Sequence, residues 1–83
     1  MSLKEEILQQ INNDFMNIKD KKVLTDDDIG ALETGITGLL GIYRIKKEEH
    51  VYNMIKEIIT FSEERGVDMS ASRLLFWNAS KKK

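Results

Sequence analysis

The sequence TDDDIGALETGITGLLGIYRI, from Thr25 to Ile45, decides how the rest of this chain has to fold. Its apolar residues recur at steps of three and four, which is the pattern of an amphipathic helix with one side against a core. The members of this stripe are Ile29, Leu32, Ile36, Leu39, Leu40 and Tyr43. Thr25 is the expected N-cap, and the three aspartates after it occupy the first turn, where the helix dipole favours negative charge. We therefore expect one long helix here.

The opposite side of this helix carries small residues, where a side facing only water is expected to carry charged ones. A glycine inside a helix costs roughly 1 kcal/mol relative to alanine, so several in one helix indicate an offsetting close contact with another backbone. The predicted close-packing face consists of Gly30, Thr34, Gly38 and Gly41. Three interpretations remain open: a neighbouring helix of the same chain, a partner protein or second copy in a homodimer, or a helix that kinks or ends among the glycines.

Two further helices are expected on either side of this one. The first runs from about Leu3 to Ile18, and Ser2 and Glu5 form a plausible capping box at its start. Its stripe is Leu3, Ile7, Leu8, Ile11, Phe15 and Ile18. The stripe of the third helix is Val51, Met54, Ile55, Ile58, Phe61 and Ser62. Because Val51 is out of phase with the preceding stripe, we predict a break around residues 45–48.

The end of the third helix and the segment after it complete the expected fold. Gly66 suits the left-handed position that ends a helix, with Val67 placed to contact Phe61. Asp68 or Ser70 can cap a short fourth helix that continues to residue 78, and residues 79–83 are expected to form a frayed basic tail. Strand patterns are absent from the sequence. We therefore predict a single domain over residues 1–83, an all-α antiparallel bundle of three long helices and a short C-terminal fourth helix.

Composition excludes several classes of function. The 83 residues include no cysteine and one histidine, so neither a disulfide framework nor a metal site is expected. A formal net charge of −1 argues against strong nonspecific binding to nucleic acid. No set of catalytic residues and no phosphate-binding loop can be assembled, so we expect neither an enzyme nor a cofactor. No apolar run is long enough to span a bilayer and no signal peptide is present, so a cytoplasmic location is the expectation.

The densest apolar cluster is Leu-Leu-Phe-Trp at residues 74–77, which lies shortly before the terminal lysines. Most of it is expected in the core, although four consecutive bulky residues cannot all face one side of a helix. Aromatic and arginine side chains are typical anchors of protein interfaces. The candidate partner-binding residues are Arg73, Phe76, Trp77, Lys81 and Lys82. Core packing of the cluster remains the alternative interpretation.

A DNA-binding alternative arises from the sequence ALETGIT, residues 31–37. It has the spacing of a helix-turn-helix core, in which Gly35 would form the turn and Thr37 would open a recognition helix. The continuation does not suit this motif, because Gly41 and Arg44 stand where buried aliphatic residues are required. The segment after Thr37 is also too apolar to lie in a groove of DNA.

Two segments carry a resemblance to a known family. They are KEEILQQINNDFMNI, residues 4–18, and HVYNMIKEIITFSEERGVDMSASRLLF, residues 50–76. Together with the charged link between the first helices, they resemble the small cytoplasmic immunity proteins that protect bacteria from pediocin-like bacteriocins, the enterocin A immunity type. The resemblance implies an antiparallel four-helix bundle that recognises a bacteriocin-occupied sugar-transporter receptor, with specificity in the C-terminal half. A small helical regulator that inhibits another protein, of phage or plasmid type, is the alternative.

Overall fold

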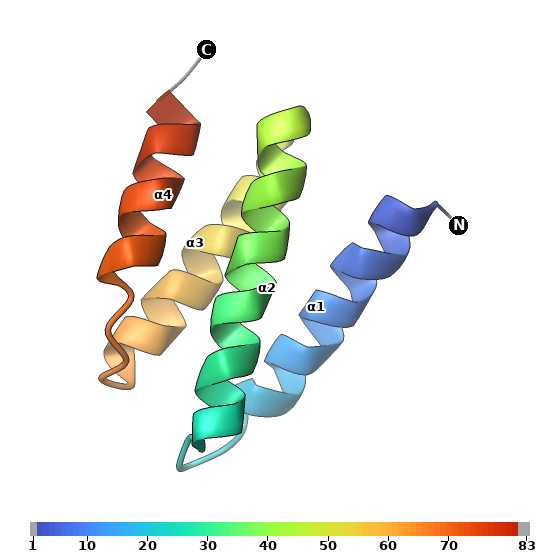
Figure 1. The fold of residues 1–83 in the computed structure, drawn as a ribbon. Helices are drawn as coiled ribbons and strands as arrows, with labels where there is room; N and C mark the ends of the chain where they lie inside the picture. The colour runs from blue at the N-terminus through green and yellow to red at the C-terminus, as the bar shows by residue number, and fades with distance from the viewer. Residues whose placement is uncertain (1, 82–83) are drawn as a thin grey trace.

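Four helices make up residues 2–81, the part of the chain that the computed structural model describes (Figure 1). They are α1 (Leu3–Lys19), α2 (Asp26–Ile45), α3 (Glu49–Glu64) and α4 (Ser70–Lys81), and no strand occurs among these residues. Successive helices run in opposite directions, and α2 packs against each of the other three. The predicted all-α bundle of three long helices and a shorter fourth is confirmed.

The start of α2 is fixed by a capping box. The Thr25 hydroxyl accepts a hydrogen bond from the Asp28 backbone N–H at 3.2 Å, and the Asp28 carboxylate accepts one from the Thr25 N–H at 2.9 Å. The Lys21 ammonium donates to the other Asp28 oxygen at 2.8 Å. The helix then continues without interruption through Gly35 to Ile45. The helix-turn-helix alternative, which needs a turn at Gly35, is therefore wrong, and so is a helix end among the glycines.

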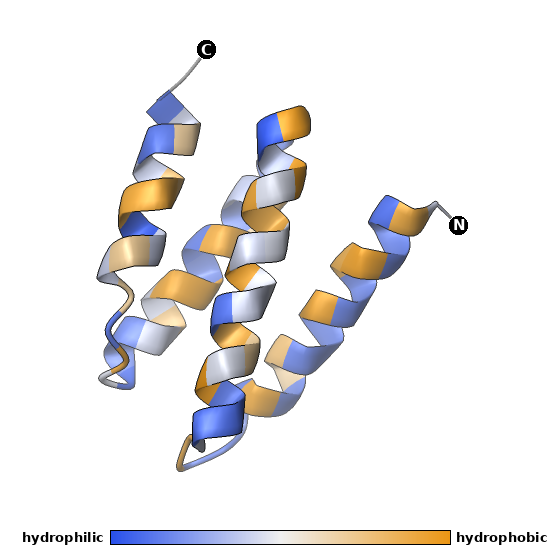
Figure 2. Ribbon diagram, viewed as in Figure 1, coloured by the Kyte–Doolittle hydropathy of each residue, from blue (hydrophilic) through white to orange (hydrophobic). Residues whose placement is uncertain are grey.

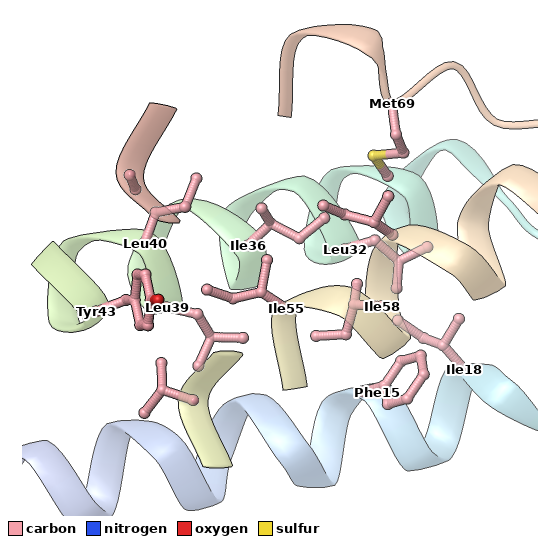
Figure 3. Close-up of a cluster of buried hydrophobic side chains, with 13 residues drawn as sticks. Phe15, Ile18, Leu32, Ile36, Leu39, Leu40, Tyr43, Ile55, Ile58 and Met69 are labelled. Atoms are coloured by element: carbon pink, nitrogen blue, oxygen red, sulfur yellow. The ribbon is translucent and has the colours of Figure 1, made fainter. Parts of the chain in front are cut away.

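The core lies between the four helices, with α2 and α3 supplying most of it. Figure 3 shows Phe15 and Ile18 of α1 approaching Ile58 of α3, with Met69 reaching in from the segment before α4. The buried apolar residues are Phe15, Ile18, Leu32, Ile36, Leu39, Leu40, Tyr43, Val51, Ile55, Ile58, Ile59, Met69 and Ala79. The stripe predicted for α2 is thus buried apart from Ile29, which is half-buried.

Both ends of α3 lie where the sequence predicts them. α2 stops at Ile45 and α3 starts at Glu49, so the break predicted from the change of phase is confirmed. At the other end Gly66 adopts a φ of +83°, a left-handed conformation that glycine takes without a steric penalty. The N–H of Val67 donates to the Ser62 carbonyl and the N–H of Gly66 to the Glu63 carbonyl, each at 3.0 Å. This pair of bonds is a Schellman motif, and it ends the helix at Gly66 as predicted.

The first half of α1 departs from the expected burial. Leu3 is 73% exposed and Ile7 39%, whereas Phe15 and Ile18 are buried. The reason is the inclination of the helix: α1 approaches α2 at its C-terminal end and diverges from it toward the N-terminus (Figure 1). A charged pair between Lys4 and Glu48, which precedes α3, connects the exposed half of α1 to the rest of the bundle.

The end of α4 also departs from the expectation. Residues 79–81, predicted as part of a frayed tail, belong to the helix, and Ala79 is buried with 5% of its surface exposed. The helix extends this far because Ala79 lies on its inward side, where a small side chain permits close packing. Lys82 and Lys83 lie outside the described residues. At the other end of α4 the Asp68 carboxylate accepts the Ser70 N–H at 3.0 Å, so Asp68 rather than Ser70 provides the cap.

Candidate functional site

The apolar cluster of α4 faces mainly outward. Leu74 is 60% exposed, Leu75 45% and Trp77 59%, so the prediction that most of this cluster lies in the core is wrong. The inward side of α4 is formed by small residues and one aromatic. These are Ser72, Phe76, Ala79 and Ser80, which are buried or half-buried. Because these residues recur at steps of three and four, the leucines and the tryptophan between them have to point away from the core.

Phe76 holds α4 against the bundle. Its ring centroid lies 4.9 Å from that of Tyr52 on α3 and 6.4 Å from that of Tyr43 on α2, with interplanar angles of 45° and 56°. Tilted pairs at these separations are favourable for aromatic rings. Phe76 therefore joins three helices and belongs partly to the core, so little of the ring is free for a partner.

A hollow of about 270 Å³ lies between α3 and α4. Three of the predicted contact residues, Arg73, Phe76 and Trp77, line one side of it. The remaining lining residues are Tyr52, Lys56, Ile59, Thr60 and Ser80. Tyr52, Lys56 and Thr60 were not predicted, although their spacing of four residues places them on one side of α3. The sequence carries that spacing but does not indicate that α4 lies beside it.

Arg73 forms an ion pair within the chain, with Glu63 of α3. Its Nε donates to the Glu63 carboxylate at 3.1 Å, and its terminal nitrogen donates to the other carboxylate oxygen. The guanidinium bonds lower the pKa of Glu63, and the same carboxylate raises the pKa of Arg73. Arg73 thus ties α4 to α3, and its charge is largely balanced by Glu63 on the same surface.

Lys81 lies one turn beyond Trp77, and its ammonium is 5.7 Å from the centroid of the tryptophan ring. This geometry is a cation–π contact. Lys82, the last predicted contact residue, lies outside the described residues. We call the exposed residues Leu74, Leu75, Trp77 and Lys81 the outer face of α4. Figure 2 shows the apolar band near the middle of this helix.

The residues of the predicted close-packing face of α2 differ in what surrounds them. A Cβ at Gly38 would meet Ile11 Cδ1 of α1 at 3.3 Å, and one at Gly35 would meet Ile11 Cγ2 at 3.2 Å. A Cβ at Gly30 or Gly41 would meet nothing within 4 Å among the described atoms. The close neighbour is therefore a side chain of α1, and it approaches only the middle of α2.

The same part of α2 lines a second hollow, of about 500 Å³, between α1 and α2. Ala31, Thr34, Gly35 and Gly38 form its wall on α2, and Ile7 and Ile11 face them from α1. The small residues leave this space because α1 is inclined and does not fill it. Of the predicted face, Thr34 and Gly38 thus border a hollow, whereas Gly30 and Gly41 are exposed.

Within residues 2–81 no group of three or more histidine, aspartate or glutamate side chains could hold a metal ion. None of the described helices has the length and apolar character needed to cross a membrane. Comparison of the chain with protein-family models, with curated proteins and with solved structures found no match. Among the described residues, the outer face of α4 is the candidate binding surface.

Proposed function

We propose that this protein is a non-enzymatic binding protein, and specifically a bacteriocin immunity protein. It would act in the cytoplasm on a membrane receptor complex and hold that complex in a closed or blocked state. The observation that supports the proposal is the outward position of Leu74, Leu75 and Trp77 on a short helix. Large apolar side chains that gather on an exposed surface mark interaction sites in soluble proteins.

The α3–α4 hollow adds shape to this surface. A partner side chain that enters it would meet Tyr52, Lys56 and Trp77. Buried aromatic residues surrounded by polar groups are typical of the residues that dominate binding energy at protein interfaces. The resemblance of residues 50–76 to the immunity family implies that specificity lies in this same half of the chain.

Expression in a bacteriocin-sensitive host tests the proposal. Cells that carry the protein are expected to survive one or a few peptides from a panel of pediocin-like bacteriocins. The double variant Leu74→Gln and Trp77→Gln is expected to lose this protection at equal protein abundance. Ile45→Gln is the matched control, because Ile45 is 88% exposed and lies on another helix. No protection by the parent protein against any peptide of the panel would exclude immunity.

A further inference from the structure

The charges of this chain are distributed unevenly along the sequence. All 14 acidic residues precede Ser70, whereas four basic residues follow it. These four are Arg73, Lys81, Lys82 and Lys83. Residues 70–83 are therefore a basic segment in a chain whose formal net charge is −1. A surface that attracts this segment through charge would at the same time repel the rest of the molecule, and this would orient the protein.

The outer face of α4 combines this charge with apolar groups. Leu74, Trp77 and Lys81 are spaced by three and four residues, so they lie along one side of the helix, opposite Ala79 and Phe76. Tryptophan and leucine on one side of a helix, together with lysine, are typical of helices that lie in the interface of a membrane. The long lysine side chain can lie along the apolar surface and keep its ammonium among charged headgroups.

The acidic residue of α3 that contacts α4 is neutralised by a basic partner. Glu63, the acidic residue closest to α4 in its contacts, is paired with Arg73. Glu57 and Glu64 line a neighbouring hollow, which shares Lys56 and Thr60 with the α3–α4 hollow and extends to Phe15 of α1. Lys56 borders the α3–α4 hollow beside Trp77. An anionic surface that approaches the outer face of α4 would thus meet the ammonium groups of Lys81 and Lys56, while Arg73 pairs with Glu63.

We propose that the outer face of α4 docks on the surface of a bilayer that contains anionic lipid. Leu74 and Trp77 enter the headgroup region, and Lys81 binds lipid phosphates. A second copy of the chain is a poorer occupant, because a symmetric contact would join two faces that each carry Lys81 and no acidic residue to pair with it. This docking goes beyond the proposed function and does not require it, since a bilayer contact needs neither a bacteriocin nor a receptor.

Trp77 makes the proposal directly measurable, because it is the single tryptophan of the chain. Vesicles of phosphatidylglycerol and phosphatidylcholine are added to the purified protein, and tryptophan emission and co-sedimentation are recorded. With anionic vesicles at low salt we expect a blue shift of the emission and sedimentation of the protein. Pure phosphatidylcholine vesicles should give neither signal, and salt at about 1 M should reverse both by screening.

Variants identify the surface. Lys81→Gln is expected to weaken partitioning roughly fivefold, the contribution of one lysine near an anionic membrane. Leu74→Gln should weaken it about tenfold or more through the loss of apolar burial. Both residues are exposed, so circular dichroism should confirm an unchanged fold. Ile45→Gln, at an even more exposed apolar position outside α4, should bind vesicles as the parent does.

Three results would overturn the proposal. One is the absence of binding to anionic vesicles. Another is equal binding to phosphatidylcholine, and a third is an equal loss in Ile45→Gln and Leu74→Gln. Analytical ultracentrifugation is run in parallel: a dimer that Leu74→Gln dissociates, without vesicle binding, would assign the face to a second copy instead. Failure of the host-protection experiment would leave the vesicle result intact, so the two proposals are separately testable.

Discussion

At the scale of single residues, the glycines of this chain differ in what they do. Gly41 lies within α2 with open space around it, and Gly66 ends α3 in a left-handed conformation. Gly41→Ala should therefore raise the free energy of unfolding by up to about 1 kcal/mol, because alanine favours the helix. Gly66→Ala should lower it by roughly 1 kcal/mol or more, because a side chain is strained at this φ.

Urea denaturation of both variants, with the parent protein as reference, measures these opposite effects. Gly38→Leu adds a third case, since Ile11 already lies 3.3 Å from the position of a Cβ. Overpacking against α1 should cost roughly 1 to 3 kcal/mol. If Gly41→Ala destabilised the protein, an unseen contact on that side of α2 would have to be invoked and our assignment of open space would be wrong.

At the scale of elements, the start of α2 should respond to acid. The hydrogen bond from Lys21 and the one from the Thr25 N–H lower the pKa of Asp28 below its ordinary value of 3.8. A carboxyl group with a lowered pKa in the folded state stabilises the protein fully above its ordinary pKa. It loses this contribution as the pH falls through the folded value. The stabilisation by Asp28 should therefore begin to fall below about pH 4 and be lost as the pH drops through the lowered pKa.

Asp28→Asn tests this dependence. The variant should be less stable than the parent at about pH 7, and the difference should shrink toward about pH 2 in urea denaturation. Asp27→Asn is the control, because Asp27 is exposed in the same helical turn and shares the dipole but not the capping box. An equal pH dependence in the two variants would show that the dipole, and not the cap, is responsible.

Some features of the helices could be predicted from the sequence and others could not. The caps at Thr25 and Gly66 and the break before Glu49 were predictable, because each depends on local chemistry within a few residues. The exposure of Leu3, Ile7 and the α4 cluster was not, since the stripes of α1 and α4 are apolar whether or not a neighbour covers them. Which side meets the core depends on the inclination of α1 and on Phe76, and these are set by tertiary packing.

At the scale of the whole molecule, Arg65 connects parts that are distant in sequence. Its guanidinium donates to the carbonyls of Lys21 at 2.7 Å and Lys19 at 3.3 Å, and it lies 4.9 Å from the Phe61 ring centroid. It therefore satisfies a carbonyl at the end of α1 from the end of α3. Arg65 is the C-cap of α3, and nothing in the neighbouring sequence indicates this long-range contact.

Replacement of Arg65 should loosen this end of the bundle. Arg65→Met is expected to lower the free energy of unfolding by roughly 1 kcal/mol, the usual net value of such hydrogen bonds. Arg65→Lys should recover only part of this, because an ammonium cannot reproduce the planar fork. Arg44→Met, at an exposed position on α2, serves as the control in the same chemical denaturation series. A loss no larger than that of Arg44→Met would contradict the connecting role.

The inclination of α1 divides that helix into two parts with different lifetimes of their hydrogen bonds. The turn around Phe15 can open only with the core, whereas the turns around Leu3 and Ile7 can open alone, held mainly by the contact of Lys4 with Glu48. Backbone amides in the first two turns should therefore exchange with deuterium by local opening, well before the bundle unfolds. Protection should rise steadily along α1 toward Ile18 and be greatest in the middle of α2 and α3.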